Sequence, residues 1–232
     1  MNPARPTGRF WARQLCNERS DQWSIFLRLK FNPMKHTADY FEALFEGDAD
    51  PWQLKSRWYE SRKRALSLAC LPQLRYQRAY EPGCANGELS AALATRCDYL
   101  LVTDGSQRAV NLATVRLAGL ANVEVKQAWV PLQWPLQTFD LIVLSEFGFY
   151  LEPDDLDSLA HKAMASLRPG GTVLACHWRR PIEGCTLTGD EVHQRLAKIL
   201  DLPHVSHLLE IDMRLDVWCR DTRSVAQHEG FA

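Results

Sequence analysis

From residue 77 onward, short apolar segments alternate with amphipathic ones, and this alternation limits the possible folds more than any other feature of the sequence. The pattern predicts helices near residues 87–96, 106–118, 153–167 and 189–200, and strands near residues 77–81, 99–103, 123–127, 139–144, 172–178, 204–211 and 213–219. The "RPGG" segment at residues 168–171 is expected to end the third helix. Alternation of this kind builds a mostly parallel sheet with helices on both faces, and its ligands bind beyond the carboxyl ends of the strands. We therefore predict a doubly wound α/β fold with a seven-stranded sheet, in which the last two strands form an antiparallel edge hairpin because no helix separates them.

A single domain is expected to hold these elements, because 232 residues with 46% hydrophobic content suffice for one sizeable core. We place it at residues 34–222, where helical patterns from Thr37 onward and across residues 50–72 precede the first strand. Residues 223–232 are treated as a tail. Residues 1–33 carry six basic side chains against two acidic ones and lack the apolar segment of a signal peptide. We expect them to be a disordered extension, or one that arises from a misassigned start.

The charge balance gives no reason to expect nucleic acid or anionic lipid as a partner, because 27 basic residues face 28 acidic ones. The seven cysteines are scattered and never form a C-x-x-C pair, so neither a disulfide framework nor a metal site is predicted. This use of cysteine suits a reducing cytoplasm. The most apolar stretch, residues 139–151, is interrupted by polar residues and is too short to cross a bilayer. We therefore predict a cytoplasmic protein that acts on a small molecule.

The sequence "AYEPGCANGELS" at residues 79–90 places small residues at every second position of a turn between a strand and a helix: Gly83, Ala85 and Gly87. Such a turn lets the backbone approach a nucleotide, which can also meet the N–H groups of the following helix N-terminus. The dinucleotide pattern G-x-G-x-x-G is not met, because Glu88 would crowd the third glycine position and repel a pyrophosphate. A P-loop sequence is also missing.

The spacing Glu81-x-Gly83-x-Ala85-x-Gly87 resembles motif I of class I methyltransferases, which bind S-adenosylmethionine. That cofactor has no phosphate, and its sulfonium and ammonium groups are compatible with an acid such as Glu81 at the strand end. Asp104 ends the predicted second strand, where a carboxylate can accept hydrogen bonds from both ribose hydroxyls. The alternative role of Asp104 is to cap the helix that follows it.

Further segments occur in order along the chain: "DPW" at residues 50–52, "RWYESRKR" at residues 57–64, "EPGCANGELS", "RCDYLLVTD", "FDLIVLSEFGFYL", "RPGGTVLACHWRRP" and "LTGDEVH". With them the chain resembles the nodulation protein S family of class I S-adenosylmethionine-dependent methyltransferases from about Thr37 to Arg220. The resemblance implies a Rossmann-like methyltransferase domain with S-adenosylmethionine as its cofactor. The namesake members N-methylate a deacetylated chitooligosaccharide, so an amino sugar or related amine is the favoured acceptor. An O- or N-methyltransferase of an unrelated metabolite and a cofactor-binding module without turnover are the alternatives.

Adenine recognition departs from the usual pattern of this class, because Ala128 and Trp129 follow the third strand in place of an acid. The backbone N–H of Trp129 or Val130 could read the adenine edge, and the indole could stack on the base. Trp129 as core filling is the alternative.

Two residues are candidates for the general base, because an amine acceptor must lose a proton during methyl transfer. Glu146 follows the fourth strand at the edge where ligands bind, and a solvated loop glutamate is its alternative reading. His177 follows the apolar "TVLAC" of the fifth strand, and a hydrogen-bonded structural histidine is its alternative reading. His193, on a later helix, is expected to lie near the substrate.

The remaining candidates are assigned by region. Class I enzymes often place a lid before motif I, so Trp52 and Tyr59 are predicted to contact the acceptor. Arg62 is predicted to pair with the methionine carboxylate of the cofactor, unless it lies on a solvated helix face. Trp178 and Arg179 are predicted to form a wall of the acceptor site.

Overall fold

The computed structural model describes residues 37–231, which belong to one structural unit. The expectation that residues 1–33 are an extension lies outside the described residues. Among the described residues, no helix combines the length and the apolar character needed to span a bilayer.

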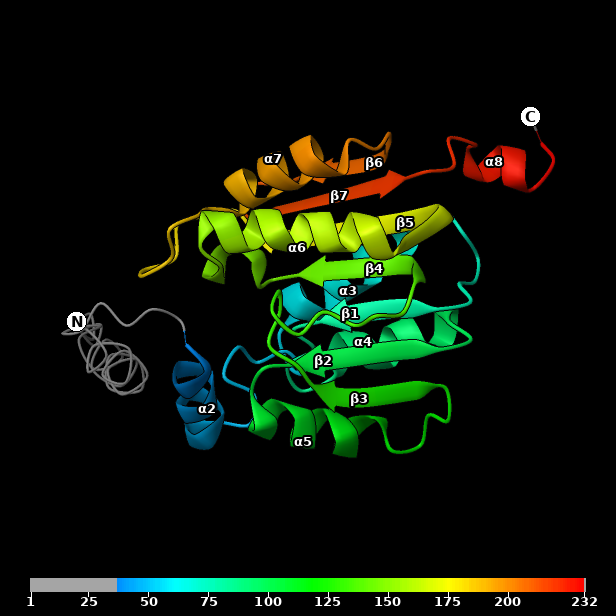
Figure 1. Cartoon of the computed structure of the whole chain (residues 1–232). Helices are drawn as coiled ribbons and strands as arrows, with labels where there is room; N and C mark the ends of the chain where they lie inside the picture. The colour runs from blue at the N-terminus through cyan, green and yellow to red at the C-terminus, as the bar shows by residue number, and fades with distance from the viewer. Residues whose placement is uncertain (1–36, 232) are drawn as a thin grey trace, which may run out of the picture. The chain divides into compact units, whose positions relative to one another are not determined.

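A mixed seven-stranded sheet forms the centre of the unit, in the spatial order β3-β2-β1-β4-β5-β7-β6 (Figure 1). The strands are β1 (Ala79–Pro82), β2 (Leu100–Asp104), β3 (Val123–Gln127), β4 (Phe139–Ser145), β5 (Leu167–Trp178), β6 (His204–Leu209) and β7 (Met213–Cys219). The first five strands pair in parallel, while β7 pairs antiparallel to both β5 and β6. The predicted doubly wound sheet and its antiparallel edge hairpin are therefore confirmed.

Helices cover both faces of the sheet. The helices of the described residues are α2 (Ala38–Gly47), α3 (Trp58–Cys70), α4 (Glu88–Leu93), α5 (Gln107–Leu117), α6 (Pro153–Ser166), α7 (Gly189–Leu200) and the short α8 (Val225–His228), with 3-10 turns η1 (Ala94–Arg96) and η2 (Gly148–Tyr150). Of these, α3 to α7 cover the two faces. One core cluster joins the sheet to α3, α4 and α5, and a second joins it to α6 and α7. Neighbouring strand residues divide between the two, because successive side chains point to opposite faces: Leu100 and Val102 pack in the first cluster and Leu101 in the second.

The "RPGG" segment differs from its predicted role. It does not lie in a loop after the helix but inside β5, which begins at Leu167, five residues before the predicted start. Leu167 pairs with Phe139 of β4, and the register shifts before Thr172 pairs with Leu141. Gly170 has a φ of +72°, a conformation that glycine adopts at little cost, so the strand continues through this irregularity.

The parallel register brings the ends of β1, β2, β4 and β5 to one edge of the sheet, here called the carboxyl edge. Residue Ala79 of β1 pairs with Leu100 of β2 on one side and with Leu141 of β4 on the other. The loops that leave these strands are therefore neighbours, and α2 lies at the same edge (Figure 1).

Close packing of α4 against α5 depends on Gly87, the residue before α4. Gly87→Ala should lower the free energy of unfolding by roughly 1–3 kcal/mol, because the backbone there has a φ of +82° and a β-carbon would lie 3.2 Å from the Cα of Ala113. Gly119→Ala is the matched control, since nothing lies within 4 Å of a β-carbon at that position, and it should change stability by less than about 0.5 kcal/mol. Urea unfolding followed by circular dichroism measures both, and equal losses would contradict the packing role of Gly87.

Candidate functional site

The turn between β1 and α4 lies at the carboxyl edge, between the loops that follow β2 and β4. Gly83, Ala85 and Gly87 all adopt left-handed backbone conformations, with φ values of +73°, +49° and +82°. The amide of Gly83 donates to the carbonyl of Thr103 in β2 at 2.7 Å. A β-carbon at Gly83 would lie 3.1 Å from the ring of Phe147, the second residue after β4. The small residues thus allow the turn to fit between the ends of two strands.

Asp104 is held in place by two backbone amides at the end of β2. Its carboxylate oxygens accept hydrogen bonds from the amides of Ala85 at 3.0 Å and Ser106 at 2.9 Å. Burial raises the pKa of Asp104 to about 6, although both amides favour the ionised form. Ser106, whose Oγ accepts from the Ala109 amide at 3.1 Å, is the N-cap of α5. Helix capping therefore does not occupy Asp104, and each of its oxygens keeps acceptor capacity for a ligand.

Glu81 of β1 is a buried acid without full compensation. Its side chain is 2% exposed, and Oε2 has no hydrogen-bond partner among the described residues. Burial raises the pKa of Glu81 to about 8; the neighbouring Ser90 hydroxyl opposes this shift, and the charge of Asp104 adds to it. A buried acceptor that lacks a donor in the protein is a natural place for a ligand's ammonium group.

The residues present fit S-adenosylmethionine. The left-handed turn exposes backbone to a ligand, Asp104 has acceptor capacity for ribose hydroxyls, and Glu81 has an unpaired oxygen for an ammonium group. The carboxylate of Asp104 beside the turn also argues against a pyrophosphate there, since like charges repel at short distance.

Trp129 lies directly over the residue that follows Asp104. A β-carbon at Gly105 would come within 1.9 Å of the indole, so the ring packs on the bare backbone of this glycine. The Trp129 amide donates to the side-chain oxygen of Gln133 at 2.6 Å, which leaves it unavailable to read an adenine edge. Val130 packs its side chain against the second core cluster. The indole of Trp129 is the part of this segment that suits a base, by stacking.

The segment before α3 is fastened to the turn through Asp50. Its Oδ1 accepts from the side-chain amide of Asn86 at 2.9 Å and from the Leu54 amide at 2.7 Å. Trp52 packs edge-to-face on Phe45 of α2, with ring centroids 5.5 Å apart. Trp52 was among the predicted site residues, whereas the bond between Asp50 and Asn86, 36 positions apart in the chain, was not predicted.

Helix α2 lies across the carboxyl edge, next to the segment that contains Asp50 and Trp52. The ring of Phe41 lies 5.1 Å from that of Tyr150, after β4, and 6.2 Å from that of Trp129, after β3. Its neighbour Glu42 accepts from the Gln107 amide at the start of α5. Residues of α2 therefore contact loops on both sides of the motif I turn.

Glu146, the first residue after β4, presents a fixed carboxylate at the same edge. Its backbone has a φ of +58°, and its amide donates to the carbonyl of Cys176 at 2.9 Å. Oε2 accepts from the Trp178 amide at 2.9 Å, and Oε1 accepts from Nζ of Lys63 at 2.7 Å. Lys63 also contacts Glu60 at 2.8 Å. Glu146 is thus an ion-paired and anchored group, whereas a solvated loop glutamate was the alternative reading.

The buried charges of α3 were not predicted. Glu60 and Lys63 are 8% and 6% exposed, although the run "ESRKR" reads as a solvated helix face. Burial opposes the charge of Lys63, but the carboxylates of Glu146 and Glu60 together hold its pKa above the usual value. A signal was present: Lys63 stands four residues after Tyr59 and three before Leu66, and both pack on the first core cluster.

Tyr59 and Trp178 form an aromatic pair beside this carboxylate. Their ring centroids are 5.7 Å apart in an edge-to-face arrangement, and Nζ of Lys63 lies 5.3 Å from the centre of the Tyr59 ring. Both side chains are partly exposed, and the hydroxyl of Tyr59 has no hydrogen-bond partner among the described residues. The structure therefore brings together Tyr59 and Trp178, which were predicted to lie at the acceptor site, and Glu146, which was predicted as a candidate base.

The two arginine assignments are not supported by the contacts. Arg62 makes a bidentate ion pair with Glu210 of the β6–β7 turn, at 2.8 and 2.5 Å, so its guanidinium is engaged away from the motif I turn. Arg179 binds Asp190 at the start of α7, with Nη2 to Oδ2 at 2.9 Å, and also donates to the Glu210 carbonyl, at 2.5 Å. The guanidinium groups of both side chains are occupied by carboxylates of the protein, so these arginines link neighbouring elements around the site.

The histidines also differ from their predicted roles. His177 and His193 are both fully buried. The Nε2 atom of His177 accepts from the Gly148 amide at 3.2 Å, and its Nδ1 lies 3.0 Å from Nε2 of His193. The basic lone pair of His177 is therefore used within the protein, and burial lowers its pKa well below the usual value. His177 does not suit a general base, and His193 lies behind it in the core.

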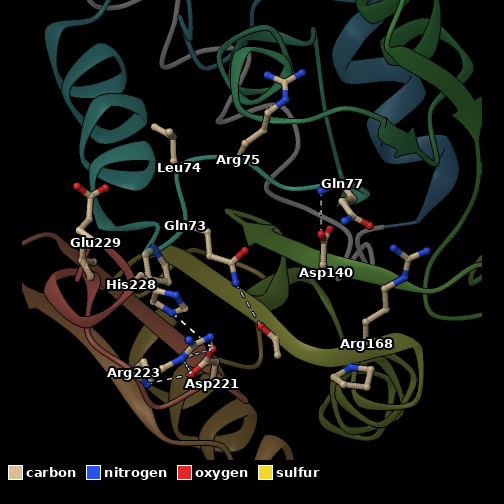
Figure 2. Close-up of a pocket in the computed structure, with 14 residues that line it drawn as sticks. Gln73, Leu74, Arg75, Gln77, Asp140, Arg168, Asp221, Arg223, His228 and Glu229 are labelled. Carbon is tan, nitrogen blue, oxygen red and sulfur yellow. Dashed lines mark hydrogen bonds and ion pairs between the residues drawn. The ribbon is translucent and has the colours of Figure 1, made fainter. Parts of the chain in front are cut away.

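A separate hollow of about 540 Å³ opens at the opposite edge of the sheet, between the loop before β1 and the segment around α8 (Figure 2). Its charged groups are largely satisfied locally: Arg223 pairs with Asp221 at 2.7 Å, and Asp140 accepts the Gln77 amide at 2.8 Å. None of the predicted site residues lines this hollow.

Comparison with known proteins agrees with this geometry. Residues 79–171 match the family described as "Methyltransferase domain". Nodulation protein S of Sinorhizobium fredii is 32% identical over 124 residues, which are 53% of this chain and 57% of that protein. The corresponding protein of Rhizobium tropici is 30% identical over 124 residues, which are 53% and 52% of the two chains. The chain thus matches little more than half the length of these curated relatives.

Solved structures extend the match. A crystal structure from Pseudomonas syringae, described as a methyltransferase, is 51% identical, with a TM-score of 0.64 over 71% of this chain and 100% of that one. The N-methyltransferase NodS of Bradyrhizobium japonicum, solved with S-adenosyl-L-homocysteine, is 22% identical and shares the fold, with a TM-score of 0.68 over 78% of this chain and 97% of that one. The chain therefore belongs to the S-adenosylmethionine-dependent methyltransferases and is similar, within them, to nodulation protein S.

Proposed function

We propose that this protein N-methylates a primary amine of a small acceptor, and that the acceptor is an amino sugar or a related amine. The observation that carries the proposal is the anchored carboxylate of Glu146 at the carboxyl edge, one residue before the Phe147 ring that packs on Gly83. Glu60, Lys63 and Glu146 together carry two negative charges and one positive charge, so the cluster has an excess negative charge. Such a cluster favours a cationic acceptor over an anionic one.

The aromatic pair beside the carboxylate supports a sugar-like acceptor. Tyr59 and Trp178 offer partly exposed rings next to Glu146, and flat aromatic surfaces bind ligand groups that have one apolar face and polar edges. The relatives named nodulation protein S, and the structure named an N-methyltransferase, are consistent with an amine as the nucleophile.

The chemistry asks the protein mainly to orient two reactants and to handle one proton. S-adenosylmethionine, when bound, supplies an electrophilic methyl group on a sulfonium. The cofactor would be held by Glu81, the motif I turn and Asp104. Helix α2 and the segment around Asp50 would exclude water from the bound cofactor. Glu146 would accept a hydrogen bond from the acceptor's ammonium and take up the proton as the amine becomes the nucleophile. Lys63 would keep the Glu146 side chain in place.

Cofactor affinity should depend on pH through the two buried acids. Burial raises the pKa of Glu81 to about 8 and that of Asp104 to about 6, whereas an ammonium and hydroxyl donors favour the ionised forms. Binding of S-adenosylhomocysteine must therefore displace protons at low pH, and its affinity should rise between pH 5 and pH 8. Isothermal titration calorimetry in two buffers of different ionisation enthalpy would count the released protons.

Glu81→Gln separates the two acids. This variant should bind S-adenosylhomocysteine about tenfold more weakly at pH 8 and should lose the part of the pH dependence above pH 7. The part between pH 5 and pH 7, assigned to Asp104, should remain. An affinity that does not change with pH in the wild-type protein would contradict the placement of both carboxylates.

Glu146→Gln tests the acceptor carboxylate. The amide keeps an oxygen for the Trp178 N–H but loses the charge, so kcat/KM for an amine should fall about 100-fold, while S-adenosylhomocysteine affinity should change less than about twofold. Transfer of a labelled methyl group measures the first and calorimetry the second. The matched control is Glu229→Gln, on the exposed C-terminal segment. Turnover that is unchanged across the pH range would remove Glu146 from the mechanism.

The acceptor class is tested by pairs of compounds that differ at one group. A chitooligosaccharide with one free amine should be methylated on nitrogen, and its fully N-acetylated counterpart should not, because an amide nitrogen is a poor nucleophile. Mass spectrometry of the products locates the methyl group. Methylation of a hydroxyl in both compounds would favour an O-methyltransferase, and cofactor binding without transfer to any acceptor would favour a module without turnover.

A further inference from the structure

A line of hydrogen bonds runs through the core from the loop after β4 to the last strand. It joins the amide of Gly148 in η2 to His177 of β5 at 3.2 Å, His177 to His193 of α7 at 3.0 Å, and His193 to Oδ2 of Asp216 in β7 at 2.5 Å. All four residues are buried, and the three side chains are fully so. We call these three side chains the Asp–His–His relay.

The geometry fixes where the protons of the relay lie. A backbone amide can only donate, so Nε2 of His177 must accept from Gly148, and a neutral His177 then carries its proton on Nδ1. That proton points to Nε2 of His193, which must accept it, so the proton of His193 lies on Nδ1 and is donated to Asp216. Burial lowers the pKa of both histidines, which keeps each ring neutral with one donor and one acceptor.

Asp216 sets the direction of the relay because it can only accept while ionised. Burial alone would raise its pKa, but hydrogen bonds from His193 and His207 hold the pKa below the usual range. Arg214 donates to Oδ2 at 2.7 Å, and the half-exposed His204 lies 3.4 Å from Oδ1. Reversing the protons of the relay would leave the Gly148 amide facing another donor.

The Gly148 end of the relay lies in the turn that carries Glu146. Residues 146–148 leave β4 through the left-handed Glu146, and their neighbours in β5 hold both ends of this turn. Cys176 accepts the Glu146 amide, the Trp178 amide binds the Glu146 side chain, and His177 accepts the Gly148 amide. A β-carbon at residue 148 would lie 2.9 Å from Nε2 of His177, so only glycine allows this approach.

We propose that His177, His193 and Asp216 are positioning residues, which act through Gly148 to hold the Glu146 turn in the geometry that methyl transfer requires. This inference rests on the proposed function for the role of Glu146. Other charged groups face the relay: Asp190 lies near His193, Lys63 lies near His177, and Arg214, His204 and His207 surround Asp216.

Two substitutions of one residue separate positioning from simple core packing. His193→Gln can still accept from His177 with its amide oxygen and donate to Asp216 with its amide nitrogen, so it preserves the direction of the relay. His193→Phe keeps an aromatic ring but removes both functions, so His177 must find another proton position. His161→Gln, on an exposed position of α6, is the matched control.

We expect kcat for an amine acceptor to fall about 10- to 100-fold in His193→Phe and by less than about threefold in His193→Gln and in the control. Affinity for S-adenosylhomocysteine should stay within about twofold in all three. Nitrogen-15 NMR should show the His177 proton on Nδ1 in the wild type and in His193→Gln, with a protected Gly148 amide. In His193→Phe the proton should move to Nε2, and the Gly148 amide should exchange faster while the amides of β4 do not.

Equal loss of kcat in His193→Gln and His193→Phe would overturn the inference, and so would a wild-type His177 protonated on Nε2, even if His193→Phe does not fold. The outcome for the proposed function is separate. A wild-type protein that shows the expected tautomers and Gly148 protection but methylates no amine would refute the proposed function and leave the positioning of the turn supported.

Discussion

Burial of three acidic side chains at the carboxyl edge is the constraint on which the rest of the structure depends. The sheet order places the ends of β2, β1 and β4 side by side, and each end region carries an acid: Asp104, Glu81 and Glu146. Each acid is stabilised differently. Backbone amides hold Asp104, the ammonium of Lys63 holds Glu146, and Glu81 keeps one oxygen without a partner among the described residues. The uncompensated acid marks where a cationic ligand group would contribute most.

This arrangement divides the work between recognition and support. Several polar side chains around the proposed site hold neighbouring elements in place. The hydrogen bond between Asp50 and Asn86 joins the segment before α3 to the motif I turn. Arg62 links α3 to the β6–β7 turn, and Arg179 links the end of β5 to the same turn. A site that holds two reactants near 3 Å needs such rigid surroundings, since small displacements cost large factors in rate.

The antiparallel β6–β7 hairpin does more than add the last two strands to one side of the sheet. Glu210 in its turn binds Arg62, and Asp216 of β7 ends the Asp–His–His relay that reaches Gly148. By contrast, Glu81 and Asp104 lie on β1 and β2, which pair with neither strand of this hairpin.

The sequence by itself determined the order of strands and helices and the glycine turn with Glu81 and Asp104, because these depend on local periodicity and on spacing within one turn. Its resemblance to a known methyltransferase family indicated the cofactor class. Only the tertiary structure decided how the polar residues at the carboxyl edge are paired. Lys63 lies in a charged run that is typical of a solvated helix face, yet it binds Glu146. His177 lies near the end of a strand, and it accepts a hydrogen bond from the Gly148 amide. Lys63 and Glu146 are 83 residues apart in the chain, and Gly148 and His177 are 29 residues apart, so no local sequence pattern predicts either contact. Long-range packing alone sets whether a charged or titratable side chain is buried, paired or free.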